Sequence, residues 1–459
     1  MPTEQGASVP TQKHPLRRVM FYIALAAGCL VAASLITFLL FTDVFVNELL
    51  KGRNIRNFEK TNPNYSLRIR GVGYDILSNR FTCDSITLTP TDSGFSCTIA
   101  ATSVSGVGWI SLFLGNALTP EHLSTSEVKA EEFVLTFPME QYRIRCGRLH
   151  VSVEDSTIVA DDFELGPIED DKQFFAAQRY RRTRYRLTVD HASMMGSTCL
   201  GVLRRDMFCG RVARLENPYL DILTNKDKRP ASDTTSPLMP YEVLSTIKAR
   251  LQIDSAMIVN GALTYGERMT VGSPAAAITF DSMNVTVGGI ANYCCDFDST
   301  RIFAQGRFMK TGRLAMRMAI PAANPEFSMQ YSGSLGPMSL TAFNPFIKVA
   351  EHVRIKSGAL QSANFDVRVK LGRANGTMRA VYRDLAIAIQ DEKTGSEKGI
   401  KNMFTSFLAN KIKIRNDNIP DESGNMKIGT VAYSRTADDT FFQFLWYSLR
   451  TGLQDVIGF

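Results

Sequence analysis

The sequence lacks the motifs that carry common enzyme chemistry. It has no phosphate-binding Gly-x-x-x-x-Gly-Lys loop, no Gly-x-Ser-x-Gly nucleophile turn and no His-Glu-x-x-His zinc helix. Its five histidines are scattered. The acidic pairs Asp161-Asp162, Asp170-Asp171 and Asp438-Asp439 occur in turn-like contexts, where we expect solvated carboxylates. We therefore expect no catalytic residue, no cofactor and no enzymatic activity.

The eight cysteines are not spaced as metal ligands. None of them forms a Cys-x-x-Cys motif and no histidine cluster lies nearby, so we expect no metal site. Cys83 with Cys97, and Cys199 with Cys209, lie on candidate neighbouring strands. Each pair fits two interpretations, a disulfide in an oxidising compartment or two small buried hydrophobic residues.

Long runs of one charge are also missing, since the net charge of +7 is spread along the chain. The densest basic run, residues 179–186, raises the alternatives of nucleic acid or anionic lipid headgroups. However, Arg184 and Arg186 alternate with Tyr185 and Leu187, which is the pattern of a strand with one solvated face. We favour the strand and expect no nucleic-acid partner.

One long hydrophobic run is present near the N-terminus. Residues 19–42 contain no charged side chain, and a helix of this length spans a bilayer with some tilt. The sequence Ala26-Ala-Gly-Cys29 resembles a lipoprotein cleavage site, but cleavage there would leave the apolar residues 30–41 at the start of a soluble domain. We therefore predict a cytoplasmic tail at 1–18 and a transmembrane anchor at 19–46. No later stretch approaches a membrane span.

The basic residues that flank the anchor do not decide its orientation. Lys13, Arg17 and Arg18 precede it, and three basic residues, at 51, 53 and 56, follow it as closely. We place the short tail in the cytoplasm and the remainder outside, on the shape of the chain and on the resemblance described below.

From about residue 65 onward the chain is dominated by alternating strand patterns. Examples are residues 81–88, 128–137, 149–159, 277–287 and 378–389, with turns marked by Gly, Asn, Asp and Pro. We predict a mainly β, elongated and mostly antiparallel body with a few short helices. A polar stretch at 225–240 is the best linker candidate, between a first β region at 47–224 and a second at 241–439.

A loose repeat recurs in both β regions. Residues 149–159, 251–265 and 355–365 each read as a short apolar strand, a turn and another strand. Such repetition suits a stack of similar β units that form a curved sheet or groove, and an ordinary sandwich without repeats is the alternative.

The alternation in the second β region suggests an apolar trough. A curved sheet that folds over without filling its interior leaves space for acyl chains, whereas an ordinary filled core has the same sequence pattern. The candidate lining residues are Phe365, Val367, Val369 and Leu371.

Two helices are predicted near the C-terminus. Residues 399–410 have an amphipathic pattern, and residues 440–459 form an aromatic amphipathic helix that is too short to cross a bilayer. We expect the second helix to close or gate the C-terminal end of the β body, with Gly452 allowing close approach or a bend. A contact with the membrane surface is the alternative. Its candidate contact residues are Phe442, Leu445, Trp446 and Leu449.

The order of these features resembles the AsmA family of Gram-negative bacteria, within the repeating-β-groove proteins that include TamB. The resemblance rests on the anchor and on the segments 253–267, 277–287, 337–346, 355–365 and 376–385. It implies a bacterial inner-membrane protein with a periplasmic β groove, linked to outer-membrane assembly and to phospholipid movement between membranes. It implies no catalytic residues. This chain is shorter than the large members of the family.

We therefore expect a single-pass protein that binds or transfers phospholipid or another acyl-chain lipid. Its expected partners are the lipid, the bilayer and other envelope proteins. The alternative is a non-catalytic envelope scaffold or regulatory protein with a filled β core.

Overall fold

The computed structural model describes residues 65–71, 73–75, 77–90, 95–106, 124–198, 207–229, 237–247, 250–270, 272–293, 297–321, 327–390, 397–398 and 414–458. These residues form one 20-stranded sheet, so the predicted mainly β, mostly antiparallel architecture is confirmed. The strands of the first half are β1 (Tyr65–Arg70), β2 (Gly73–Asp75), β3 (Arg80–Pro90), β4 (Ser96–Ser105), β5 (Glu127–Phe137), β6 (Tyr142–Ser152), β7 (Thr157–Pro167), β8 (Arg182–Met195), β9 (Met207–Glu216) and β10 (Tyr219–Asn225). Those of the second half are β11 (Arg250–Arg268), β12 (Ala276–Ala291), β13 (Ser299–Phe308), β14 (Gly312–Pro321), β15 (Met329–Leu335), β16 (Met338–Ser339), β17 (Val353–Lys370), β18 (Arg373–Gln390), β19 (Glu397–Lys398) and β20 (Gly429–Ser434).

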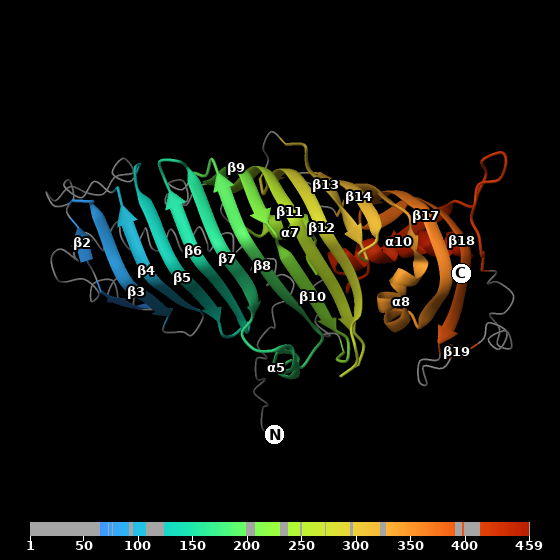
Figure 1. Cartoon of the computed structure of the whole chain (residues 1–459), viewed down its shortest axis with the longest axis horizontal. Helices are drawn as coiled ribbons and strands as arrows, with labels where there is room; N and C mark the ends of the chain where they lie inside the picture. Colours follow the sequence, from blue (N-terminus) through green and yellow to red (C-terminus); the bar gives the residue numbers. More distant parts are fainter. Residues whose placement is uncertain are drawn as a thin grey trace, which may run out of the picture.

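The strands lie side by side almost in chain order (Figure 1). β3 pairs with β1 and β2 on one side and with β4 on the other, and antiparallel pairing continues from β4 to β8. Antiparallel pairing resumes from β11 to β15 and continues through β17 to β18, which pairs with β19 and β20. Short connections between consecutive strands explain this order.

A parallel seam joins the two halves of the sheet. β9 and β10 lie end to end along β8, and both pair in parallel with β11. Parallel neighbours need a crossover connection, which residues 226–249 supply, with α7 (Pro240–Ser245) in it. The predicted linker therefore falls largely within this crossover, and the two predicted β regions share one sheet.

Each long strand of the first half shifts its alternation by one residue near its middle. In β5, Val128 and Ala130 are buried, and after an extra residue the buried positions continue at Phe133, Leu135 and Phe137. The extra residue, Glu132, has a left-handed backbone with φ 48°, as does Asp162 in β7 with φ 55°. Such a bulge bends a strand. It also keeps the apolar side chains on one face, which we call the inner face.

The shifted positions line up across neighbouring strands. The register places Glu132 of β5 opposite Gly147 of β6, and Gly147 opposite Asp162 of β7, because the pairs on either side of these residues stay in register. Register shifts occur within the β4–β5 pair next to Glu132, and within the β11–β12 and β17–β18 pairs. A row of shifted positions thus runs across the first half, with a bulge between β4 and β5.

The three segments predicted to repeat do not occupy equivalent places. Residues 251–265 lie within β11 and residues 355–365 lie within β17, both long strands with irregular pairing. The predicted strand, turn and strand occur only at 149–159, because β6 ends at Ser152 and β7 begins at Thr157, so the prediction of one strand over these residues is wrong. Residues 153–156 form the turn between β6 and β7. The turns predicted within 251–265 and 355–365 are also wrong, since β11 and β17 run through them.

Helices among the described residues are α5 (Asp171–Ala176), α7, the 3-10 helix η3 (Leu340–Phe343), α8 (Asn344–Ala350) and α10 (Phe441–Ile457). The predicted C-terminal helix is confirmed as α10. Its N-cap, Thr440, accepts a hydrogen bond from the Gln443 backbone N–H, and Gly458 ends it in a left-handed conformation with φ 78°.

α10 packs directly on the inner face of the second half. A Cβ atom on Gly452 would lie 2.7 Å from Cγ2 of Val431 and 2.8 Å from Cβ of Met378, so the expected close approach at Gly452 is confirmed. On the sheet side, Gly429 leaves room for the helix, because a Cβ there would lie 2.1 Å from the Gly452 carbonyl oxygen. Two glycines therefore allow contact between backbones.

α10 also covers donors of the strand β20. The backbone N–H of Thr430 donates to the Asp455 carboxylate at 2.8 Å, and that of Ala432 donates to the Thr451 hydroxyl at 3.1 Å. Neither N–H group pairs with β18. Side chains of α10 therefore accept hydrogen bonds that the backbone of another strand would otherwise accept.

No helix within the described ranges is both long and apolar enough to cross a membrane. The predicted tail at 1–18, the anchor at 19–46 and the amphipathic helix at 399–410 lie outside the described residues.

Candidate functional site: the inner face and its C-terminal helix

The inner face of the first half is lined by closely packed apolar side chains. Phe133, Ile144 and Leu165 come from three neighbouring strands and are at most 2% exposed. At one end of these strands, the Phe174 ring of α5 packs edge-on against Tyr142, with ring centroids 5.6 Å apart. The Tyr142 hydroxyl accepts a hydrogen bond from the Tyr185 backbone N–H at 3.0 Å. This end of the inner face is therefore held by packing and by a buried hydrogen bond.

The described cysteines are free thiols. Cys83, Cys97 and Cys146 are buried, and Cys83 and Cys97 do not form the disulfide that was one of the two alternatives for them. Burial raises the pKa of Cys97 and of Cys146 to about 12, so both stay protonated at neutral pH. They pack as small hydrophobic residues. Cys199 lies outside the described residues, and its proposed partner Cys209 is a free thiol.

Three of the four predicted groove residues share the inner face of β17. Val367 and Val369 are buried, and Phe365 is half-buried, with its ring 6.1 Å from that of Tyr331 on β15. Leu371 does not belong with them: it lies in the tight turn between β17 and β18, has φ 53° and is 58% exposed. The strand pattern missed the turn because a leucine rarely occupies a left-handed position.

α10 lies over this part of the sheet. The hydroxyl groups of Tyr331 and Ser448 are 2.6 Å apart, and both side chains are buried. Burial raises the pKa of Tyr331 to about 12. Phe444 packs against Phe327 and Tyr433, at ring centroid distances of 4.9 and 5.8 Å. The predicted groove and the predicted gate are thus neighbours.

The four predicted contact residues of α10 are not its most buried ones. Phe444, Ser448, Gly452 and Val456 form the deeply buried stripe, at a spacing of four residues. Leu445, Trp446 and Leu449 lie on its flank and pack partly against the core, while Phe442 is 36% exposed. The large apolar side chains of the flank were predicted to make the main contact. Close contact between helix and sheet instead requires the small residues Ser448 and Gly452 at the centre of the buried stripe.

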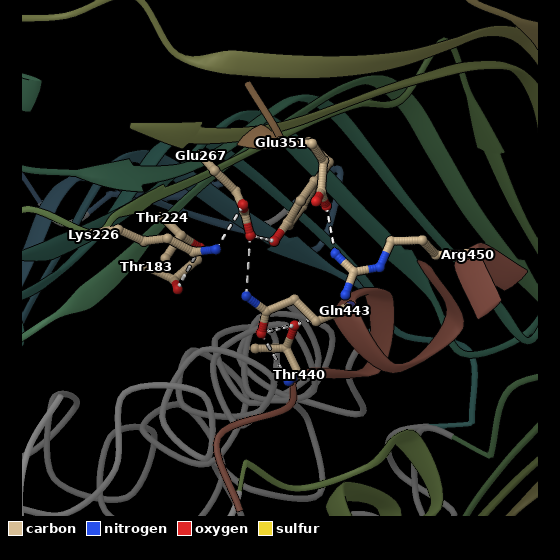
Figure 2. A network of polar contacts seen from close by, with 9 residues as sticks. Thr183, Thr224, Lys226, Glu267, Glu351, Thr440, Gln443 and Arg450 are labelled. Atoms are coloured by element: carbon tan, nitrogen blue, oxygen red, sulfur yellow. Dashed lines mark hydrogen bonds and ion pairs between the residues drawn. The ribbon is translucent and has the colours of Figure 1, made fainter. Parts of the chain in front are cut away.

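The flank of α10 joins it to α8. The Trp446 ring meets the Phe346 ring edge-on at 5.3 Å, and the Arg450 guanidinium donates to the Glu351 carboxylate at 2.6 Å. Figure 2 shows this ion pair close to the polar network at the start of α10.

A buried carboxylate links the start of α10 to the parallel seam. Glu267, near the end of β11, is 4% exposed and accepts hydrogen bonds from Lys226 at 2.7 Å, Tyr265 at 2.7 Å and Gln443 at 3.1 Å (Figure 2). Gln443 in turn accepts from Thr440, the N-cap of α10. We call Lys226, Tyr265, Glu267 and Gln443 the seam network.

The electrostatics of the seam network favour a neutral Tyr265. Burial, and then the nearby Glu267 charge, raise the pKa of Tyr265 well above its ordinary value. Tyr265 therefore stays a hydrogen-bond donor to Glu267 at physiological pH. The network spans the crossover, β11 and α10, so three segments far apart in the sequence depend on one carboxylate.

Sequence reasoning missed the seam network, although a signal was present. Glu267 follows Leu263 and Tyr265 at alternate positions, which places a carboxylate on an apolar face, where a charge requires partners. The interpretation of Arg184 as solvated was also wrong. Arg184 is 3% exposed and is paired with Asp171 at 3.1 Å and Asp221 at 2.6 Å.

The acidic pairs differ from the expected solvated turns in one clear case. Asp439 is 3% exposed and accepts hydrogen bonds from Tyr433 at 2.8 Å and from Thr436. It anchors the chain just before α10. Asp170 caps α5, and Asp161 precedes Asp162, which has a left-handed backbone in β7.

The chemistry of the inner face is that of a binding or packing surface. Over the described ranges, no group of three or more His, Cys, Asp or Glu side chains could hold a metal ion. Comparison with protein-family models found no match to this chain, and a search of curated proteins found no relative.

Proposed function

We propose that this protein is a membrane-anchored, lipid-binding protein of the bacterial envelope, in which the inner face of the sheet accommodates acyl chains. The observation that supports this most is the continuity of the apolar inner face. A one-residue shift near the middle of each long strand of the first half preserves that face, and a bulge such as that between β4 and β5 bends a strand, a geometry suited to wrapping around an elongated apolar ligand. The proposed ligand is phospholipid or another acyl-chain lipid.

In this proposal α10 is the cover of the second half. It lies over the inner face that carries Val367 and Val369, so a ligand there requires the helix to move. Its attachment combines close backbone packing at Gly452 with polar contacts from Gln443 to Glu267 near its start and from Arg450 to Glu351 near its middle. Polar contacts of this kind can exchange partners with water when the helix moves.

The proposed location is the inner membrane, with residues 19–46 as anchor, residues 1–18 in the cytoplasm and the β body in the periplasm. Contribution to outer-membrane assembly or phospholipid homeostasis follows from the resemblance to the AsmA family. An alkaline phosphatase fused after Phe459 is expected to be active, because that enzyme matures only after export. A fusion active only as a cytoplasmic reporter would contradict this topology.

The second candidate is a non-catalytic envelope scaffold, and one observation favours it. Tyr142, Ile144 and Leu165 on the inner face are each 0% exposed, as expected of a filled core. Lipid binding and a filled core make different predictions for what contacts the inner-face side chains in the cell.

Photocrosslinking separates the two candidates. A photoreactive phenylalanine analogue is placed at Phe133 or Phe365 on the inner face, with Phe303 as the matched control, since Phe303 lies on β13 and is 50% exposed. We expect phospholipid adducts at the inner positions and few at Phe303, together with phospholipid co-purifying in native mass spectrometry. Adducts only to protein at Phe133 and Phe365, with no co-purified lipid, would favour the scaffold.

A further inference from the structure

A cluster of arginines lies at one end of the parallel seam. Arg179 and Arg181 follow α5, Arg229 follows β10, and Arg268 ends β11. Backbone hydrogen bonds bring these segments together: Arg181 N–H donates to the Arg229 carbonyl at 3.0 Å, and Lys226 N–H donates to the Arg268 carbonyl at 2.7 Å. Three segments distant in sequence therefore present Arg179, Arg181, Arg229 and Arg268, which we call the arginine cluster.

Aromatic rings hold the side chains of this cluster. The guanidinium carbons of Arg179 and Arg229 both lie over the Tyr180 ring, 5.5 and 5.9 Å from its centroid. That of Arg268 lies 5.9 Å from the centroid of Phe175 on α5. A ring stabilises a guanidinium by a cation–π contact and leaves its edge N–H groups available to an anion.

Within the described residues, no carboxylate forms an ion pair with any of the four arginines of the cluster, whereas Asp171 pairs with Arg184 and Arg186, and Glu267 pairs with Lys226. The Nε atoms of Arg181 and Arg268 are buried and have no hydrogen-bond partner within the described part of the chain. Buried donors of this kind normally have an acceptor.

The neighbouring Lys228 is a donor and so cannot be that acceptor, and its own ammonium group is already hydrogen-bonded. Lys228 donates to the carbonyl oxygens of Phe175 at 2.8 Å and Ala176 at 3.3 Å, and also to that of Gln178. It thereby completes the end of α5. α5 protrudes from the sheet near the end of β10 (Figure 1).

We propose that the arginine cluster binds the phosphate of anionic phospholipid headgroups. Planar guanidinium groups match phosphate oxygens through paired, charge-assisted hydrogen bonds, and four cations with no ion pair to a described residue favour a ligand with net negative charge. The inference rests on the proposed lipid-binding function and deepens it by naming the headgroup class and the residues that select it.

The test uses the full-length protein in neutral detergent, with soluble dihexanoyl phosphatidylglycerol as the probe and dihexanoyl phosphatidylcholine as its uncharged counterpart. Arg179→Gln/Arg229→Gln removes two exposed members of the cluster. The matched control, Arg301→Gln/Arg307→Gln, removes two exposed arginines of β13 with the same change in charge. A second cluster variant, Arg181→Gln/Arg268→Gln, replaces the two residues with unpaired Nε atoms.

We expect the wild type and the β13 control to prefer phosphatidylglycerol, and each cluster variant to bind it at least about tenfold more weakly, with a preference that falls as salt rises. Equal binding by all variants would overturn the inference, as would tight binding of inorganic phosphate that phosphatidylglycerol cannot displace. If one cluster variant has a lower melting temperature than the control, phosphatidylglycerol binding by the other cluster variant tests the inference.

These outcomes are distinct from those of the photocrosslinking experiment. Loss of headgroup preference in a variant that still gives acyl-chain adducts at Phe365 supports both proposals. Inner-face adducts without any headgroup preference leave the lipid-binding proposal intact and remove the arginine cluster from it. Arginine-dependent binding of phosphatidylglycerol without inner-face adducts would support the arginine cluster as a headgroup site and contradict the inner face as the acyl-chain site.

Discussion

The two halves of the sheet bury the same kind of face in different ways. From β3 to β8, the inner side chains belong to strands of 10–14 residues whose burial alternates with a one-residue shift near the middle. From β11 to β20, the inner face meets α10, which contacts β11, β15, β18 and β20. Burial in the second half therefore depends on helices: α10 follows the last strand, and α8 and η3 pack against β17.

The largest expected effect tests how tightly the first half is packed. Ile144→Ala removes a side chain that is 0% exposed, and we expect it to lower the free energy of unfolding by about 2–5 kcal/mol. Chemical denaturation of the purified protein measures this. Arg145→Ala, on the exposed face of the same strand, is the control and should change stability by less than about 0.5 kcal/mol. A cost for Ile144→Ala as small as that of the control would indicate an open inner face.

A smaller effect is expected where α10 meets β20. Gly429→Ala places a Cβ atom 2.1 Å from the Gly452 carbonyl oxygen, so the helix must shift, at a cost of about 1–3 kcal/mol. Hydrogen exchange should increase in α10 and β20 and stay unchanged in β5 to β7. Gly288→Ala is the matched control, since its nearest neighbour would be the Asp254 carbonyl oxygen at 3.9 Å. Increased exchange throughout the sheet would show that the two halves do not respond separately.

The smallest expected effect concerns one buried hydroxyl in each half. Burial raises the pKa of Tyr142 in the first half and of Tyr331 in the second from 10.0 to about 12. The folded state therefore favours the neutral tyrosine, so this contribution to stability is complete below pH 10 and is lost as the pH rises toward 12.

Tyr331→Phe should lower stability by about 1 kcal/mol at neutral pH, because the contact with Ser448 is lost. Denaturation curves measured at several pH values should also show a weaker loss of stability above pH 10 than in the wild type. Tyr142→Phe should do the same while leaving hydrogen exchange in α10 unchanged. Unaltered pH dependence in both variants would mean that neither hydroxyl titrates with unfolding.

Much of the architecture could be predicted because strand alternation and helix capping are local signals. The strands at 128–137 and 378–389 and the helix α10 follow from side-chain periodicity over ten or more residues. The one-residue shift in the middle of each strand is also visible in the sequence. In β6, for instance, the apolar positions 142, 144 and 146 are followed by 149 and 151, but a search for a strict period of two does not allow for such a shift.

The sequence-based predictions are wrong where contacts between distant elements determine which side chains are buried. Arg184 is buried because Asp171 and Asp221 arrive from other elements, and no local pattern reports their approach. Leu371 lies in a turn that the following Gly372, with φ 72°, does mark, but the alternation from Phe365 onward was extended through it. The buried stripe of α10 follows the small residues that fit between helix and sheet, whereas hydrophobic periodicity weights the large ones.

The contacts between α10 and β20 also set where the sheet stops growing. An edge strand with free backbone donors can recruit a strand from another molecule, and repeated recruitment produces polymers. Here Asp455 and Thr451 occupy the donors of Thr430 and Ala432 from within the same chain. α10 therefore prevents further strand pairing at β20. A molecule whose α10 has moved away from the sheet exposes β20 as an edge strand, with which a strand of a second molecule can pair.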